Sequence, residues 1–270
     1  MKDKSIHEAL RLKISRERVG VEIGKIFAGP DPYAGLELIE SFDLYDTVFA
    51  DPASTPGHTQ AQGHRQRTYA ALQWITTESR HICSSLKVED DVAVAWFLAA
   101  YVPWCEDAKA AVAAAREGIK ATNIWSKLLE DSIKNRAAIR EAVSLVNTDK
   151  ATRGAIGMVM RACKETWRFQ VLYSLLCDLT FAEDYGKVPE YERFLTYLQE
   201  QKLEDATSID KKLVLKGNEI KSALGVAKAG SWIKAAVDMV TEWQFDNEDT
   251  ATKEAATEMI KSRRQELGLE

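Results

Sequence analysis

Residues 14–32 read ISRERVGVEIGKIFAGPDP, and this stretch decides the fold class. Ser15 is a residue type that caps helix N-termini, and apolar residues follow it at helical spacing. Gly29-Pro30 ends that helix, because neither residue continues a helix well. Asp31-Pro32 then begins another helix, with a capping carboxylate and with proline at the first helical position. This order of cap, amphipathic face, stop and restart predicts consecutive helices.

The remainder of the chain has the same helical character. Among 270 residues there are only 14 glycines and 6 prolines, and 46% of the residues are hydrophobic. Apolar residues recur at helical spacing over four long stretches, 106–118, 123–146, 151–184 and 189–201. No pair of strands is evident, so the sequence predicts an all-α, multi-helix array without a β-sheet domain.

Two changes in composition predict the domain boundaries. Residues 50–67 are aperiodic and rich in Pro, Gly, Thr and Gln, which predicts a long exposed loop. The character of the chain changes again after Glu204, where short helices and turns replace long helices. We therefore expect three regions, 1–52, 53–205 and 206–270.

Charge is distributed unevenly on a chain whose net charge is −5. Residues 109–140 carry seven Lys and Arg against three acidic residues, and residues 210–238 carry six lysines against three. Basic segments of this kind suit the phosphates of RNA, which supply most of its salt-dependent affinity for proteins. They equally suit solvated helix faces whose charges pair within the helix. The sequence leaves both interpretations open.

The segment 216–232 offers a candidate site for phosphate. Glycine-rich turns that open a helix can present backbone N–H groups to a phosphate, and here lysines flank them. A purely structural interpretation is equally compatible, with one glycine capping a helix and another forming a turn. The candidate RNA-binding residues are Lys216, Gly217, Gly225, Lys228, Gly230 and Lys234.

No pattern in the chain indicates catalysis or metal binding. Two-metal phosphoryl transfer needs carboxylates held close together, as in a D-x-D motif on a strand, and no such motif occurs. The four histidines form neither an H-x-x-x-H pair nor a His-Asp dipeptide, and the four cysteines form no C-x-x-C pair. We expect no catalytic residue, no metal ligand and no cofactor bound by this chain. The absence of a long apolar run or a signal segment predicts an intracellular protein.

Several of these motifs together resemble a known family. The run Ser15-Arg16-Glu17-Arg18-Val19 with Glu22 is similar to the last shared motif, S-x-E-R-[IV]-x-x-E, of class II CCA-adding tRNA nucleotidyltransferases and their poly(A) polymerase relatives. Near the other end, residues 215–225 and 230–244 resemble the tail of fungal members of this family. One departure is that Ala229 and Ser231 flank Gly230, where the family usually has proline.

The resemblance implies a neck remnant, a helical body and a helical tail. In the family, a head domain carries the metal-binding carboxylates, the neck templates CTP and ATP, and body and tail helices grip the acceptor and TΨC arms of tRNA. The head and the templating motif would lie before Met1, so the chain would bind tRNA and be inactive alone. Mg²⁺, CTP and ATP would be bound only if a catalytic head were supplied. Ser15, Glu17, Arg18 and Glu22 would support the neck helix.

Two other hypotheses remain. The chain could be a helical scaffold or dimerisation protein without RNA binding. Alternatively it could be an RNA-binding subunit whose partner chain supplies the catalytic head. The second hypothesis predicts exposed apolar positions around Leu10, Leu12 and Ile14, which the partner would cover.

Overall fold

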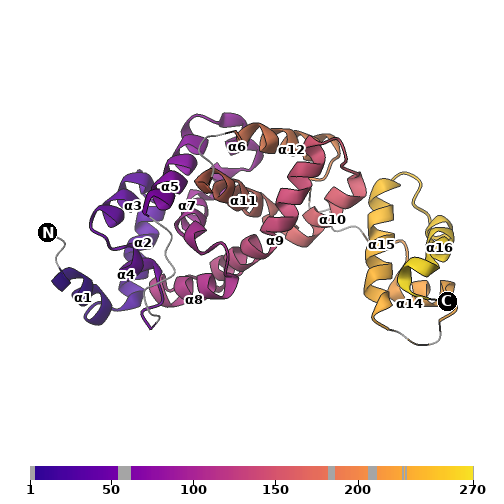
Figure 1. Cartoon of the computed structure of the whole chain (residues 1–270), viewed down its shortest axis with the longest axis horizontal. Coiled ribbons are helices and arrows are strands. Elements are labelled where there is room, and N and C mark those ends of the chain that lie inside the picture. The colour runs from indigo at the N-terminus through magenta and orange to yellow at the C-terminus, as the bar shows by residue number, and fades with distance from the viewer. Residues whose placement is uncertain are drawn as a thin grey trace. The chain divides into compact units, whose positions relative to one another are not determined.

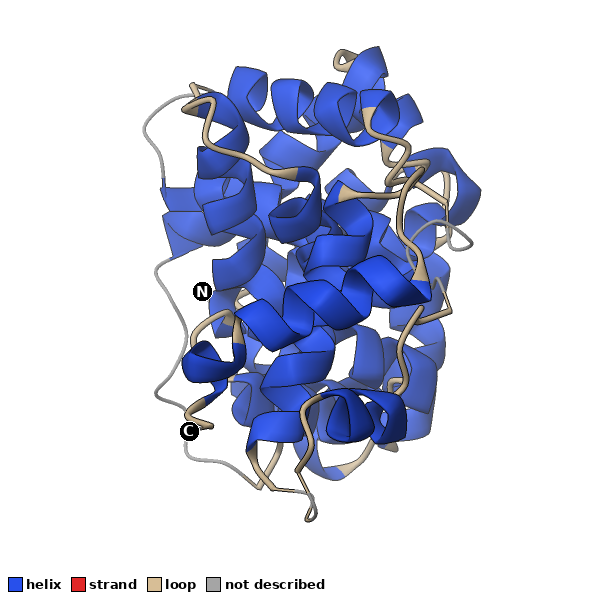
Figure 2. Cartoon of the chain, turned by 90° about the vertical axis from the view of Figure 1, so that its right-hand side faces the viewer, coloured by secondary structure: helices blue, strands red, loops and turns tan. Residues whose placement is uncertain are grey.

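The computed structural model describes residues 4–53, 62–181, 186–205, 212–226, 228 and 230–269. Within these ranges every regular element is a helix and no strand occurs (Figure 2), which confirms the all-α prediction. Figure 1 gives the order of the helices along the chain. Residues 54–61 of the predicted loop, including His58, lie outside the described part of the chain, and so do Lys211 and Ala229.

The chain divides into two compact units, residues 1–143 with 165–195 and residues 144–164 with 196–270. The helices that lie in the first unit are α1 (Lys4–Leu12), α2 (Arg16–Phe27), α3 (Pro32–Ser41), α4 (Tyr45–Phe49), α5 (Gln62–Thr77), α6 (Arg80–Ser85), η1 (Val88–Asp91), α7 (Val92–Ala100), η2 (Val102–Trp104), α8 (Ala108–Ile119) and α11 (Trp167–Phe181). The second unit contains α10 (Arg153–Cys163), α14 (Gly217–Ala223), α15 (Trp232–Asp246), α16 (Lys253–Ser262) and η4 (Arg264–Leu267). The boundaries between the units fall at η3 (Lys164–Thr166) and within α9 (Asn123–Asn147) and α12 (Val188–Glu200). The division into regions 1–52, 53–205 and 206–270 stays a prediction.

The predicted helix caps are present. The Ser15 hydroxyl accepts a hydrogen bond from the backbone N–H of Arg18 at 3.5 Å, at the start of α2. The Asp31 carboxylate accepts one from the N–H of Ala34 at 2.9 Å, and Pro32 is the first residue of α3. These side chains satisfy donors that the first turn of a helix leaves unpaired.

Helix α5 corrects the predicted loop, because it begins at Gln62 rather than after residue 67. Its Arg65 forms a buried bidentate ion pair with Glu40 of α3, with Nε–Oε1 and Nη2–Oε2 distances of 2.6 and 2.9 Å. The same guanidinium lies over the ring of Tyr45, 4.3 Å from its centroid. This tertiary interaction holds residues in a helix whose local composition favours a loop.

The stretch 151–184, predicted as one periodic helical segment, is two helices within the described residues. Helix α10 ends at Cys163, and Lys164 adopts a positive φ of 56° before α11 begins at Trp167. The break matters because α10 belongs to the second unit and α11 to the first. A lysine in the left-handed region is uncommon, and the sequence has no glycine or proline there to signal it.

Close packing fixes α2 in the first unit. A Cβ at Gly20 would lie 2.1 Å from the carbonyl oxygen of Ile119, so only glycine allows α2 to approach the end of α8 this closely. The buried ring of Phe27, at the other end of α2, lies 6.3 Å from the ring of Phe49 and 6.4 Å from that of Phe97. These contacts position the helix whose sequence carries the family motif.

The second unit has a core of its own. The buried residues of this core come from α14 and the residues that flank it, and from α15, α16 and η4: Leu215, Ile220, Leu224, Ala236, Val240, Ala256, Ile260 and Leu267. Helices α10 and α15 meet through glycine, since a Cβ at Gly157 would lie 2.7 Å from the ring of Phe245. This core holds the lysine-bearing segment 212–234 in place.

Candidate nucleic-acid interface

The four predicted support residues all lie at the start of α2 or along it. Ser15 caps the helix, and Glu17 and Arg18 are exposed in its first turn. Glu22 pairs with Lys25 of the same helix, with a carboxylate–ammonium distance of 2.8 Å. The exposed pairing within α2 is worth little, because solvent screens it. Support of a neighbouring helix by these residues stays a prediction.

An apolar groove of about 650 Å³ runs beside these residues. Apolar side chains from α1 to α4 line it, while Glu17, Arg18 and Glu22 also contribute to its wall. Ile14 is 39% exposed and Val21 is 57% exposed, which is unusual for residues of this size. The prediction of exposed apolar positions is therefore confirmed for Ile14, and Leu10 lines the groove half-buried. The side chain of Leu12 lies outside the described part of the structure.

A second, smaller cavity of about 50 Å³ lies where α1, α2 and α4 meet. It is lined by two arginines, Arg11 and Arg16, together with Asp46, Thr47, Ala50, Asp51 and Pro52. Arg16 donates from Nη2 to the carbonyl oxygen of Thr47 at 2.7 Å, whereas its Nε and Nη1 are buried without a hydrogen-bond partner. Sequence reasoning did not single out Arg11 or Arg16, because only the fold brings them together.

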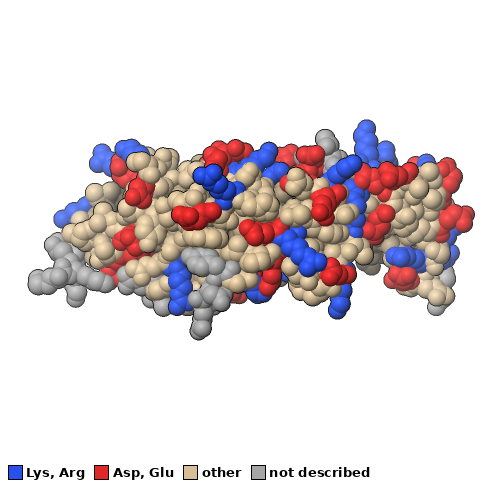
Figure 3. All heavy atoms as spheres, turned by 90° about the horizontal axis from the view of Figure 1, so that it is seen from above, with Lys and Arg blue, Asp and Glu red and all other residues tan. Residues whose placement is uncertain are grey.

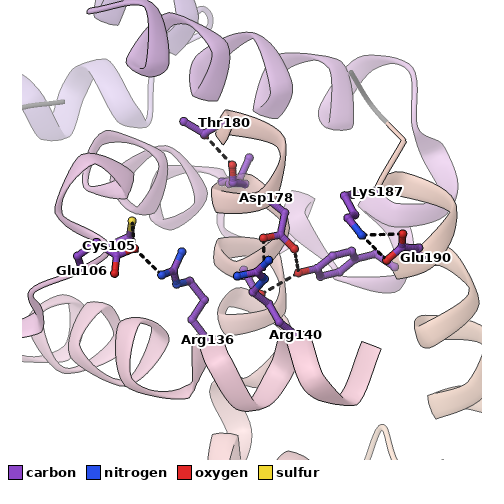
Figure 4. Close-up of polar contacts among 11 residues, drawn as sticks. Cys105, Glu106, Arg136, Arg140, Asp178, Thr180, Lys187 and Glu190 are labelled. Atoms are coloured by element: carbon purple, nitrogen blue, oxygen red, sulfur yellow. Dashed lines mark hydrogen bonds and ion pairs between the residues drawn. The ribbon is translucent and has the colours of Figure 1, made fainter. Parts of the chain in front are cut away.

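The first basic segment, 109–140, is largely neutralised. Five of its seven basic side chains form ion pairs, namely Lys120–Glu117, Lys127–Asp131, Lys134–Glu130, Arg136–Glu106 and Arg140–Asp178. Figure 4 shows the last two pairs, with Arg136 pointing to Glu106 and Arg140 to Asp178. The Asp178 carboxylate also accepts from the Tyr191 hydroxyl at 3.0 Å, and burial raises the pKa of this carboxylate. The interpretation as helix faces whose charges pair locally therefore holds for Lys120, Lys127 and Lys134, whereas Arg136 and Arg140 pair with residues outside α9.

The second basic segment, in the tail, differs. Lys216, Lys228 and Lys234 are exposed, and none of them forms an ion pair with another described residue. The carboxylate of Glu219, three residues after Lys216, is already engaged. It accepts from the backbone N–H of Lys216 at 2.8 Å and pairs with Lys253 at 2.5 Å. The ammonium groups of these three lysines can therefore contact a ligand without the loss of an existing ion pair.

The structure brings some of the predicted tail residues together and separates one. A Cβ at Gly217 would lie 3.6 Å from Ile233, so Lys216 and Lys234 lie at the same end of the α14–α15 pair. Gly225 follows the other end of α14 with a φ of 66°, and it donates to the carbonyl oxygen of Ser222. Its position is that of a helix C-terminal cap. Gly230 precedes α15, where its carbonyl oxygen accepts from Ile233 at 3.1 Å.

Acidic residues after α15 have a structural role. Asp246 accepts a hydrogen bond from the N–H of Gly154 at 2.5 Å, at the start of α10. Arg153 beside it pairs with Glu248 and donates to the carbonyl oxygens of Gln201 and Phe245. These contacts join α10 to the ends of α12 and α15 within the second unit.

Among the described residues, no three His, Cys, Asp or Glu side chains lie close enough together to hold a metal ion. The four cysteines are buried, and none of them forms a disulfide with another described residue. No described helix is long and apolar enough to cross a membrane. On the face seen in Figure 3, basic and acidic side chains are interspersed rather than gathered by sign.

Comparison with known proteins defines the class of the chain. Residues 7–56 match the family described as "Probable RNA and SrmB-binding site of polymerase A". This segment contains most of α1, all of α2 to α4, and all the residues that line the apolar groove and the arginine cavity. The protein is thus an all-α chain with a segment similar to the RNA-binding segment of poly(A) polymerases.

The relatives are nucleotidyltransferases of fungi. The chain is 30% identical to Nucleotidyltransferase lcsQ of Purpureocillium lilacinum, over 98% of this chain and 56% of the relative. It is 25% identical to the mitochondrial CCA tRNA nucleotidyltransferase of Candida glabrata, over 97% of this chain and 56% of the relative. With tRNA nucleotidyltransferase cca2 of Schizosaccharomyces pombe it shares 21% identity, over 94% of this chain and 53% of the relative.

The predicted family resemblance is confirmed. The chain is related along almost its whole length to fungal nucleotidyltransferases, in a manner consistent with their C-terminal region, and those of Candida glabrata and Schizosaccharomyces pombe are named as tRNA nucleotidyltransferases. It spans about half the length of the curated relatives it matches. No solved structure matches it.

Proposed function

We propose that this chain is a tRNA-binding region of a CCA tRNA nucleotidyltransferase, and that its tail grips the acceptor and TΨC arms. The observation that carries the proposal is the set of unpaired, exposed lysines in the tail, Lys216, Lys228 and Lys234. A lysine already paired with a carboxylate gains little from a phosphate, because binding would require breaking the existing pair. Unpaired lysines on a folded unit attract phosphates without that cost. The relatives' names and the RNA-binding segment at residues 7–56 support the same function.

The proposal assigns no chemical step to this chain. The described residues do not fit a two-metal centre, since no cluster of acidic, His or Cys side chains has the required proximity. Mg²⁺, CTP and ATP would be held by a catalytic head, and the chain alone would bind tRNA without extending it. Its own contribution would be affinity and the positioning of the tRNA 3′ end.

The test is tRNA binding by the purified chain across a salt series, with a parallel CTP and ATP incorporation assay. We expect binding whose affinity falls as salt rises, and no incorporation. Replacing Lys216, Lys228 and Lys234 by alanine should make the fall of log affinity with log salt shallower. The magnitude of the slope should decrease by about 2, since each lost phosphate contact removes about 0.7–0.9. Incorporation by the lone chain would contradict the absence of a catalytic step.

A matched control is available on α9. Lys127 and Lys134 are exposed but paired with Asp131 and Glu130. The double variant Lys127→Ala, Lys134→Ala removes charge of the same sign and should leave the slope nearly unchanged. Equal losses in both variants would refute the argument from unpaired lysines. Lack of tRNA binding at low salt would refute tRNA binding itself and favour the scaffold hypothesis.

A second candidate function is favoured by the apolar groove. A separate chain that carries the catalytic head would cover Ile14 and Val21, and burying a side chain of this kind contributes about 1.5–3 kcal/mol. We expect the portion of the Candida glabrata enzyme that this chain does not match to restore incorporation when it is added separately. Val21→Glu should abolish that restoration and leave tRNA binding intact. A homodimer that Val21→Glu dissociates would instead favour a dimerisation protein.

A further inference from the structure

The cavity between Arg11 and Arg16 holds an unusual polar arrangement. Of the Arg16 guanidinium donors, Nη2 reaches the Thr47 carbonyl oxygen at 2.7 Å, while Nε and Nη1 are buried and have no partner. A buried donor without an acceptor costs about 1–3 kcal/mol, more when it is charged. Two such donors on one planar group are therefore a strong indication that a bound acceptor completes the site.

The charge of the free donors favours an anionic acceptor. The parallel N–H pairs of a guanidinium are Nε with Nη2 and Nη1 with Nη2, so Nε and Nη1 of Arg16 point to different sides of the group, and each of them matches an oxygen of a phosphate or carboxylate. Arg11 lies at the same cavity, and its Nη2 donates to the carbonyl oxygen of Pro52 at 3.3 Å. Burial, followed by the charge of Arg11, lowers the pKa of Arg16. An anion between the two guanidinium groups would relieve both the missing hydrogen bonds and this repulsion.

The carboxylates of the cavity restrict the charge of that anion. Asp46 and Asp51 also line it, and Asp51 accepts from the N–H of Ala53 at 2.8 Å. These two negative charges formally balance the two positive charges of Arg11 and Arg16. A singly charged phosphodiester is therefore tolerated better than a doubly charged terminal phosphate, which the aspartates repel more strongly.

The size and place of the cavity agree with a backbone contact. A volume of about 50 Å³ accommodates the oxygens of one phosphate and excludes a base. All the lining residues lie between Arg11 and Pro52, inside the segment that matches the RNA-binding family. Unlike the tail lysines, these groups belong to the first unit, so the contact is a second and separate one.

We propose that the Arg11–Arg16 cavity binds one phosphodiester group of the RNA backbone, with Arg16 donating a charge-assisted hydrogen bond to it. The proposal rests on the proposed function, because it assigns RNA contacts to a second place on the chain. Its role is to position RNA along the α1–α4 segment without reading the sequence.

The experiment measures the tRNA affinity of Arg16→Gln, Arg16→Lys and Arg11→Gln over a salt series. We expect Arg16→Gln to weaken binding about tenfold, because the variant loses a charge-assisted hydrogen bond to the phosphate. The magnitude of the salt slope should fall by about 0.7–0.9, the value for one phosphate contact. Arg16→Lys keeps the charge but not the planar guanidinium donors, so it should retain the slope and only part of the affinity. Lys25→Gln removes an exposed, ion-paired charge from the same helix and serves as the matched control.

The outcomes separate this proposal from the proposed function. Wild-type binding that Arg16→Gln and Arg11→Gln leave unchanged would overturn the cavity site alone and assign the free donors to water. Absence of wild-type binding would overturn the tRNA-binding function, and this site would fall with it. If Arg16→Gln melts at a lower temperature than the wild type, its weaker binding could reflect lost stability. The affinity of Arg11→Gln then tests the cavity site, because the Arg11 side chain is exposed and its replacement should not destabilise the fold. A last comparison uses tRNA that lacks its 5′ phosphate. If Arg16→Gln no longer weakens the binding of this tRNA, the cavity binds the terminal phosphate, and the proposal of a phosphodiester ligand is refuted.

Discussion

Replacing Arg65 by methionine should destabilise the first unit by about 3–5 kcal/mol, the usual cost of breaking a buried ion pair by removing one partner. The Glu40 side chain is 1% exposed and that of Arg65 is 8% exposed, so water cannot replace the lost partner. The variant leaves a buried carboxylate that keeps a long hydrogen bond from the Tyr69 hydroxyl, at 3.5 Å. It also removes the guanidinium from the ring of Tyr45.

The double variant Glu40→Met, Arg65→Met distinguishes electrostatics from packing. It removes both charges and fills similar volume with apolar atoms, so it should recover most of the loss or exceed the wild type in stability. Urea denaturation followed by tryptophan fluorescence gives the midpoints, because five of the seven tryptophans, Trp74, Trp96, Trp104, Trp125 and Trp167, lie in this unit. Amide hydrogen exchange in α5 localises the effect. A loss below about 1 kcal/mol for Arg65→Met, or a double variant less stable than either single one, would refute the reasoning.

Three further outcomes are expected. Gly20→Ala should destabilise the first unit, because its Cβ would meet the backbone oxygen of Ile119 at 2.1 Å, and a lowered melting temperature checks this. Gly157→Ala should cost about 1–3 kcal/mol in the second unit, because the buried ring of Phe245 must move; a urea midpoint equal to that of the wild type would contradict it. Because burial raises the pKa of Asp178, the folded state binds its proton more tightly than the unfolded state does. The difference in the free energy of unfolding between the wild type and Asp178→Asn should therefore decrease as pH rises from about 4, near the pKa of an unfolded Asp, through the raised pKa of the folded state. Urea titrations at several pH values measure this difference, and a difference that does not change with pH would contradict the prediction.

Local signals in the sequence predict most of the helices and little of the site. Ser15 and Asp31 cap helices where their types and neighbours indicate, because capping depends on residues within one turn. The start of α5 was predicted wrongly, since the ion pair of Arg65 with Glu40 spans 25 residues and leaves no local pattern. The break at Lys164 was missed because this residue takes a positive φ of 56° with no glycine or proline beside it to signal the end of a helix.

The candidate site shows the same limit more sharply, because counting charges along a sequence does not show which charges are available. The segments 109–140 and 210–238 look alike in composition. In the first, however, basic residues pair with acidic residues at helical spacing or with Asp178 of α11. In the tail, Glu219 is occupied by Lys253 and by a backbone N–H, so it neutralises none of the three predicted lysines. Arg16 is the converse case, since a single arginine within a family motif becomes a candidate ligand only when the fold buries two of its donors without an acceptor. A phosphate responds to unpaired donors rather than to composition, and pairing is a property of the tertiary structure.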